Sequence, residues 1–257
     1  QEMSRGLGDV YKRQITYESE TQDTVWHVAI NRAGEVIAER PIAVRDGPSI
    51  HECSITDDYV IVFDLPVTIS LPTLAQGYNF PYRWNKAHPA RVGLLPRRGD
   101  VDDIIWCDVD PCYVFHVANS FQNEDGSVTI DCCAYESMFA HGPDGPNGVP
   151  CGFERWRVDP KTRKVTRTAI DTSPQEFPRV DERHFGQSYR HAWIVSQPTE
   201  TISNFVAENA LYHHDLETGE KRSYSFGPDL VGGEFVFVPR TPAVSYTHLR
   251  AHETSPD

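Results

Sequence analysis

The sequence predicts an all-β protein, and three observations support that prediction. Short runs rich in β-branched and aromatic residues recur along the chain, and no window of about a dozen residues shows convincing helical periodicity. Nineteen prolines and 17 glycines separate these runs. Because 39% of the 257 residues are apolar even before the glycines are added, the composition is that of a packed globular domain rather than a disordered chain.

The expected strands follow one another along most of the chain. Residues 24–30 and 35–44 are expected to form a hairpin around a turn at residues 31–34. Five later β-branched and aromatic runs are also expected to be strands: residues 59–64, 113–117, 128–135, 192–196 and 234–238. Longer loops are expected at residues 71–91 and 141–150.

Two stretches look like copies of one hairpin. Residues 155–167 and 211–224 each place a strand before an Asp-x-x-Thr motif and a charged strand after it, with Asp159 and Asp215 separated by 56 residues. The turn at residues 31–34 resembles a looser third copy. An antiparallel hairpin that recurs at blade-sized intervals indicates a β-propeller, with a β-sandwich as the alternative.

Both ends of the chain are expected to be foreign to the protein. Residues 4–14 (SRGLGDVYKRQ) and 244–254 (VSYTHLRAHET) can be encoded by the two complementary strands of one DNA segment, so they resemble a sequencing adaptor. Residues 1–14 and 244–257 are therefore interpreted as adaptor-derived and are expected to lack packing partners. Residues 15–243 are interpreted as part of one domain, and the pair His248 and His252 is set aside.

Charge and hydropathy exclude some partners. A net charge of -13 disfavours nucleic acid, because acidic side chains repel phosphate backbones. The longest uncharged apolar stretches, such as residues 59–63, are far shorter than the roughly 20 residues of a membrane helix. These features favour a cytoplasmic location and leave a peripheral membrane contact open. A signal peptide cannot be assessed, because the native N-terminus is expected to be missing.

The six cysteines are expected to be free thiols. The chain is long enough for a core of its own, and Cys132 and Cys133 are adjacent on an expected strand, so they face opposite sides. The sequence contains no C-x-x-C pair, so a structural zinc site has little support. The six are Cys53, Cys107, Cys112, Cys132, Cys133 and Cys151.

Two histidines are candidates for chemistry. His51 comes just before an expected buried strand, and His116 lies within an apolar strand whose Phe115 and Val117 face the other side. An imidazole at the inner end of a propeller strand can point at the central axis, although a packed histidine is the alternative for each.

The remaining histidines are weaker candidates. His88 and His141 are expected to be exposed loop residues, and His213 and His214 are expected on opposite faces of an outer strand.

Four blocks of the chain resemble the carotenoid cleavage oxygenases, the family that includes the retinoid isomerase of the eye, the apocarotenoid oxygenases and the bacterial lignostilbene dioxygenases. They occur in the family's order and span most of residues 15–243. The blocks are H-x(3)-I-T-D-x-Y-V-I-V-F in residues 51–66, F-H-x-x-N and Asp-Cys-Cys in residues 115–135, EFPR in residues 176–179, and GEFVFV in residues 233–238.

The resemblance implies a seven-bladed β-propeller with a non-heme iron(II) on its axis, held by four histidines. His51 resembles the second ligand and His116 the third, while the first and fourth would lie outside this chain. Glu176 matches the carboxylate that holds the third ligand, and Glu234 the one that holds the fourth. Iron(II) accepts neutral imidazole, and a carboxylate on the far N–H fixes the tautomer of a ligand histidine. No other catalytic residue and no organic cofactor are implied.

The resemblance further implies oxidative cleavage of a carbon-carbon double bond to two carbonyl products. Dioxygen and an apolar conjugated molecule, either a carotenoid, an apocarotenoid or a stilbene, would be the substrates. As the incomplete C-terminal portion of the ring, this chain is expected to leave sheet edges open, to fold poorly and to be inactive alone. The substrate, the cleaved bond and the oligomeric state stay open.

Two alternatives to the oxygenase remain. The first is a non-catalytic β-propeller that serves as a binding scaffold and whose central histidines only pack. The second is a propeller hydrolase, which has less support because no G-x-S-x-G motif is present.

Overall fold

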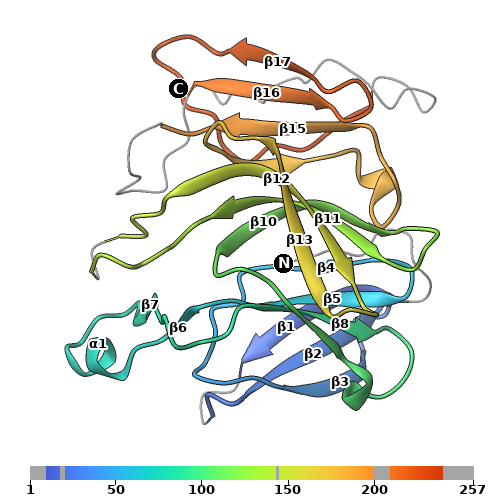
Figure 1. Ribbon diagram of the computed structural model, residues 1–257, viewed down its shortest axis with the longest axis vertical. Coiled ribbons are helices and arrows are strands. Elements are labelled where there is room, and N and C mark those ends of the chain that lie inside the picture. The colour runs from blue at the N-terminus through green and yellow to red at the C-terminus, as the bar shows by residue number, and fades with distance from the viewer. Residues whose placement is uncertain (1–9, 18–20, 143–144, 199–208, 240–257) are drawn as a thin grey trace.

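The computed structural model describes residues 10–17, 21–142, 145–198 and 209–239. Nearly all regular secondary structure in this part of the chain is strand (Figure 1), and its one α-helix, α1 (Leu71–Ala75), has five residues. None of the described helices is long and apolar enough to cross a bilayer. The prediction of an all-β fold is confirmed.

Three meanders of four antiparallel strands form most of the structure. The first contains β4 (Cys53–Ile55), β5 (Tyr59–Asp64), β8 (Arg91–Pro96) and β9 (Ile105–Asp108). The second contains β10 (Tyr113–Gln122), β11 (Val128–Tyr135), β12 (Pro150–Asp159) and β13 (Lys164–Asp171). The third contains β14 (Gln175–Arg179), β15 (His191–Ser196), β16 (Ala210–Asp215) and β17 (Glu220–Ser225). Four-stranded meanders in series are the blades of a β-propeller, so the fold is a partial propeller.

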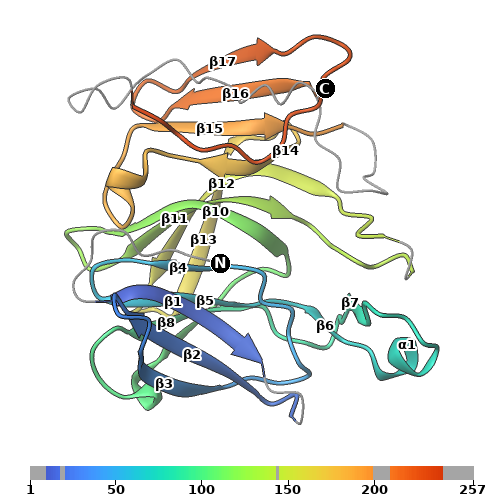
Figure 2. The same ribbon diagram turned by 180° about the vertical axis from the view of Figure 1, so that it is seen from behind.

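The first strand of each meander faces the first strand of the next. We call β4, β10 and β14 the leading strands; β10 contacts both of the others, and the meanders stack along the long axis of the molecule (Figure 2). The outer strands β9 and β13 meet in parallel at a single pair, Lys164 and Asp108. Side chains near the start of each leading strand are therefore brought together from segments far apart in sequence.

Three smaller units complete the described structure. β1 (Val10–Tyr17), β2 (Thr24–Asn31) and β3 (Val36–Ala43) form a separate sheet, and β6 (Val67–Ile69) pairs with β7 (Tyr82–Trp84). The latter pair and α1 form an arm that extends from the body (Figure 1). Two short 3-10 helices, η1 (Val101–Asp103) and η2 (Glu182–His184), lie in connections.

The repeated hairpins are confirmed as β12–β13 and β16–β17. At each turn the Asp side chain accepts hydrogen bonds from the backbone: Asp159 Oδ1 from the amides of Lys161 and Thr162, at 2.8 and 3.4 Å, and Asp215 Oδ1 from those of Glu217 and Thr218, at 3.1 and 3.3 Å. A short Asp side chain can satisfy a turn amide two or three residues ahead, and this explains the shared motif.

The core is divided between the meanders. Cys132 packs with the apolar cluster that includes Trp156 and Leu94, whereas Cys133 packs with Phe153 and Ile194 on the other side. The expectation that the two cysteines face opposite sides is therefore confirmed. All six cysteines are free.

Two expectations about the chain ends and strands are wrong. Residues 10–14 were expected to lack packing partners, but they belong to β1 and pair with β2, and the buried Arg13 lies 3.2 Å from His27 Nε2. The open edge of β2 offers backbone groups that any extended segment can satisfy. Residues 234–238 form no strand, because Phe235 and Phe237 instead pack beside Trp193. Residues 1–9 and 244–257, with His248 and His252, lie outside the described residues.

The expectation for His88 is also wrong. Its side chain is buried between two carboxylates, with Nδ1 3.0 Å from Asp46 Oδ2 and Nε2 2.7 Å from Asp64 Oδ1. Asp64 is fully buried and also accepts a hydrogen bond from Arg91 Nε at 2.7 Å, so it needs cationic partners that local sequence does not reveal. His141 is exposed, as expected.

Candidate metal centre

His51 and His116 come together at the start of two leading strands. His51 lies two residues before β4, and His116 is the fourth residue of β10. Their ring centroids are 5.0 Å apart, and the rings are nearly perpendicular at 88°. Two histidines separated by 65 positions in the sequence are thus placed on neighbouring leading strands at the distance at which imidazoles can share one ion.

The backbone of β10 is irregular at His116. Its register with β11 shifts between Val114 and Val117 and again between Val117 and Asn119. Such bulges are common beside active sites, because the extra residue redirects a side chain that a regular strand would hold elsewhere. The irregularity explains how a histidine in an otherwise apolar strand turns toward His51.

Glu176 holds the far side of the His116 ring. It is the second residue of β14 and is fully buried, and its Oε2 lies 2.8 Å from His116 Nδ1. The same oxygen accepts the amide of Phe177, whose positive φ of 59° places it in the sparsely populated left-handed region. Because a carboxylate oxygen accepts, this contact favours a proton on His116 Nδ1, and in the neutral ring Nε2 then keeps the lone pair that a metal needs.

The pKa values of the two rings are shifted in opposite directions. Partial burial, and then the neighbouring His116, lower the pKa of His51 to about 4, so His51 is neutral at pH 7. Burial also lowers the pKa of His116, but the charge and hydrogen bond of Glu176 outweigh burial and raise the pKa overall.

Glu234 lies close enough to act on both rings but is held elsewhere. Its charge raises the pKa of His51 and of His116, while its Oε2 accepts a hydrogen bond from Arg179 Nη2 at 2.6 Å. About half of its side chain, 52%, is exposed. The structure thus brings His51, His116 and Glu176 into contact and leaves Glu234 beside them.

Sequence reasoning missed Glu52 and the role of Asn119. Glu52 is buried, and its Oε2 accepts the Val117 amide at 2.7 Å. Burial raises the pKa of Glu52 to about 7, against the opposing effects of His116 and of this hydrogen bond. The only feature of the sequence that could have indicated Glu52 is its position, directly after His51 and just before a buried strand.

Asn119 is the last residue of the F-H-x-x-N block and anchors the connection after β14. Its Nδ2 donates to the carbonyls of His184 and Gln187, each at 2.9 Å, and its Oδ1 accepts the amide of Gly186 at 3.0 Å. Both donor hydrogens and the acceptor of this buried amide are used. Asn119 therefore holds the third meander against the strand that carries His116.

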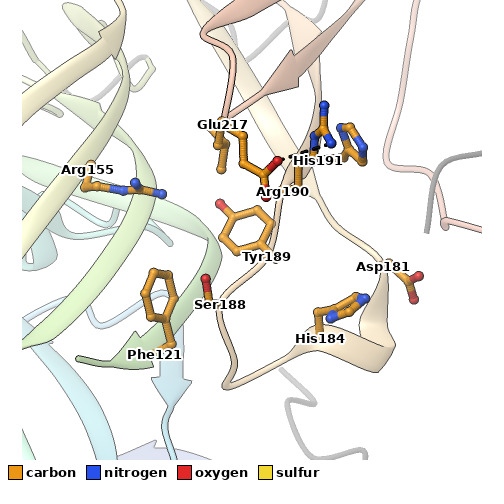
Figure 3. Close-up of a pocket in the computed structure, with 10 residues that line it drawn as sticks. Phe121, Arg155, Asp181, His184, Ser188, Tyr189, Arg190, His191 and Glu217 are labelled. Carbon is orange, nitrogen blue, oxygen red and sulfur yellow. Dashed lines mark ion pairs between the residues drawn. The ribbon is translucent and has the colours of Figure 1, made fainter. Parts of the chain in front are cut away.

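A polar cavity of about 320 Å³ lies away from the histidine pair, toward the other end of β10 (Figure 3). Phe121, Arg155, Tyr189, Arg190 and Glu217 are among its lining residues. The charged groups are already paired: Arg155 Nη2 lies 2.8 Å from an Asp131 oxygen, and Arg190 Nη1 lies 3.1 Å from Glu217 Oε2. This cavity is separate from the histidine pair, because Phe121 is five positions further along the strand than His116.

Two other buried histidines form hydrogen bonds with neighbouring side chains. His213 Nε2 lies 3.1 Å from His191 Nδ1, and His214 Nε2 lies 2.8 Å from Gln175 Oε1. Among the described residues, no group of three or more His, Cys, Asp or Glu side chains could hold a metal ion.

A sequence model of the family described as retinal pigment epithelial membrane protein matches residues 6–249. The chain belongs to this family. It is 30% identical over 273 residues to a carotenoid cleavage oxygenase of Mycobacterium tuberculosis, covering 89% of this chain and 54% of that protein. It is 27% identical over 241 residues to the apocarotenoid-15,15'-oxygenase of Synechocystis, covering 90% and 48%.

Solved structures of the family share the fold. A cobalt-substituted apocarotenoid oxygenase of Synechocystis superposes with a TM-score of 0.75 at 26% identity, covering 91% of this chain and 50% of that one. A lignostilbene dioxygenase of Pseudomonas brassicacearum gives 0.76 at 22% identity, covering 90% and 52%. The resemblance found in the sequence is confirmed, and the chain spans about half the length of the relatives it matches.

Proposed function

We propose that the protein containing this chain is a non-heme iron(II) dioxygenase that cleaves a carbon-carbon double bond of an apolar conjugated substrate to two carbonyl products. One observation carries the proposal: His51 and His116 face each other across two leading strands, with Glu176 bonded to the far nitrogen of His116. The alternative, a binding scaffold with packed histidines, has no need for a buried carboxylate on that nitrogen.

The residues present fit iron(II). Both donors are imidazole nitrogens, which suit iron(II), and the low pKa of His51 keeps that ring in its neutral form. The proton held on His116 Nδ1 leaves Nε2 to bind the metal. The two further histidine ligands that the resemblance implies would come from outside this chain. When bound, the iron would bind and activate dioxygen beside the alkene.

The chain's own residues orient the histidines and place aromatic side chains beside them. Glu176 holds the proton on His116 Nδ1 and so fixes the ring. Phe115 packs edge-on against His51 with centroids 5.0 Å apart, and Phe177 lies 5.2 Å from the His116 ring. These aromatic side chains give an apolar substrate a matching surface next to the metal.

The substrate is proposed to be a carotenoid, an apocarotenoid or a stilbene. Support comes from the relatives, which are named as oxygenases of carotenoids and apocarotenoids and as a lignostilbene dioxygenase. The test is to incubate the iron-loaded full-length protein with one apocarotenoid and one hydroxystilbene and to identify aldehyde products by chromatography. Cleavage that persists in a His116→Ala variant, or iron content below one equivalent in active protein, would contradict the proposal.

We also propose a cytoplasmic protein that touches a lipid surface through the arm of β6, α1 and β7. Leu71, Leu74 and Phe80 on this arm are 59%, 51% and 47% exposed, and the exposed basic residue Lys86 follows them. Apolar side chains next to basic ones suit insertion among anionic headgroups. Co-sedimentation with vesicles of anionic phospholipid should fall in a Leu71→Ser/Leu74→Ser variant, and unchanged binding would contradict this contact.

The 257-residue chain alone is proposed to be inactive and poorly soluble. It carries two of the four implied ligands, and it spans about half of the matched relatives. Its unpaired sheet edges would invite association between copies. Soluble, iron-loaded and active 257-residue material would contradict this proposal.

A further inference from the structure

The seam between the leading strands β4 and β10 is closed by side chains. In the described sheets β4 pairs with β5 and β10 with β11, so the facing edges of β4 and β10 share no strand pairing. Side-chain hydrogen bonds cross the gap at three places in order: between Glu52 and Val117, between Ser120 and both Ser54 and the Ile55 carbonyl, and between Gln122 and Asp58. Backbone groups on such edges need partners when they are buried.

The link nearest the histidines joins their two neighbours. Glu52 directly follows His51, and Val117 directly follows His116. The Glu52 Oε2 accepts the Val117 amide at 2.7 Å, and the Glu52 side chain is buried, with 5% of the residue exposed. The hydrogen bond between Glu52 and Val117 therefore links the backbone next to His51 to the backbone next to His116, and this link limits the distance between the two rings.

Glu52 differs from the two other carboxylates at the site. Glu176 acts on a ring nitrogen of His116, and Glu234 is bonded to Arg179. Glu52 instead fixes a backbone amide at the point where the register of β10 shifts. A bulged edge strand without this acceptor would leave a buried N–H unsatisfied and would be free to relax toward a different register.

We propose that Glu52 is a positioning residue that sets the spacing of His51 and His116 by holding the Val117 amide. The metal part of this inference rests on the proposed function. The structural part does not, because the ring spacing exists without metal.

Two conservative substitutions distinguish the effect of the length of the Glu52 side chain from the effect of its charge. Glu52→Gln keeps an acceptor oxygen at the same distance along the side chain and removes the charge. Glu52→Asp keeps the charge but is one methylene shorter, so it cannot reach Val117 N without backbone movement. Ser54→Ala is the matched control, since it removes a 2.6 Å hydrogen bond to Ser120 Oγ at the next position of the same seam and leaves Glu52 in place. Ser120 Oγ keeps its hydrogen bond to the Ile55 carbonyl at 2.9 Å.

The experiment uses the full-length protein in two states. Crystal structures of the metal-free variants give the separation of the His51 and His116 rings, and Co²⁺ titration followed by visible absorption gives metal affinity. The Glu52→Gln and Ser54→Ala proteins should keep the 5.0 Å centroid spacing and the unmodified affinity. The Glu52→Asp protein should lose that spacing and bind Co²⁺ on the order of 10-fold more weakly, the low end of losses for residues that orient ligands.

The outcomes distinguish the inference from the proposed function. Unchanged spacing in Glu52→Asp, or a Glu52→Gln protein as impaired as Glu52→Asp, would overturn the positioning role. If spacing changes as expected but the unmodified protein binds no Co²⁺, Glu52 still positions the rings and the metal site itself is wrong. Weaker Co²⁺ binding in Ser54→Ala equal to that in Glu52→Asp would also overturn the inference, because the effect would then belong to the whole seam.

Discussion

His116 donates its Nδ1 proton to the Glu176 carboxylate, 2.8 Å away, across the seam between the second and third meanders. The two residues are 60 positions apart, and each lies near the start of its leading strand. This contact fixes the tautomer of one histidine of the pair. It also links the second and third meanders close to His51, which precedes the first strand of the first meander.

Replacing Glu176 by Gln should lower the pKa of His116. Burial disfavours the imidazolium, and the charge and hydrogen bond of Glu176 oppose it, so removing the charge leaves burial less opposed. NMR titration of the metal-free full-length protein with labelled histidine measures this pKa. Glu217→Gln is the control, because Glu217 pairs with Arg190 on the polar cavity. An unchanged or raised His116 pKa would show that Glu176 does not stabilise the protonated ring.

Replacing His88 by Asn should remove one pH dependence of stability. Burial lowers the pKa of His88, but Asp64 and Asp46 outweigh burial and raise the pKa above 6.5. His88 therefore contributes fully to the free energy of unfolding below about pH 6.5, and that contribution is lost as pH rises through the raised folded-state pKa.

Urea unfolding between pH 6 and 9 measures this effect. The difference in unfolding free energy between the unmodified protein and His88→Asn should be largest at the acid end. The control is His141→Asn, since His141 is exposed. A difference that grows with pH would have the wrong sign for a histidine held between two carboxylates.

Gly152→Ala should destabilise the protein more than Gly126→Ala. Both glycines have positive φ, 94° and 87°, so each alanine carries a strain of about 1–2 kcal/mol. A Cβ at Gly152 would also lie 2.2 Å from the Asp171 carbonyl oxygen, whereas nothing lies within 4 Å of one at Gly126. Thermal unfolding compares the two variants, and equal midpoints would mean that β12 and β13 can move apart at little cost.

Asp215→Ala should lower the unfolding temperature more than Asp159→Ala. Both carboxylates satisfy two turn amides, but Asp215 also accepts two hydrogen bonds from Arg190, at 2.9 and 2.6 Å. A carboxylate that holds a neighbouring guanidinium is worth more than one that only caps a turn. If both substitutions have the same effect on the midpoint, the Arg190 pair contributes nothing to stability.

Local pattern was enough to find several of the longer strands and the repeated hairpins, but it missed β8 and β9, and it predicted a loop where α1 and β7 lie. Residues 128–135 form a strand whose side chains are buried on both faces. The turns that begin at Asp159 and Asp215 are local hydrogen-bond motifs. Residues 234–238 show the limit of such reasoning. They have strand composition, but they pack by their aromatic side chains and pair with no strand in the described part of the chain.

The site could be predicted only where a motif carried long-range information. His51, His116 and Glu176 were found through family blocks, because no local rule places residues 51, 116 and 176 together. Glu52 and the buried His88 were missed for the same reason. Their roles depend on which strands become neighbours, and composition near each residue does not specify that.

The most direct test of the account is whether His51 and His116 bind one metal ion together. Zn²⁺, a diamagnetic ion, is added to the metal-free full-length protein with labelled histidine, and the ring signals are followed by NMR. The account predicts that the His51 and His116 signals shift or broaden at the same metal concentration and saturate at one equivalent, while those of His88 and His214 stay unchanged. Independent responses of the two rings, or no response of either, would contradict a shared metal centre.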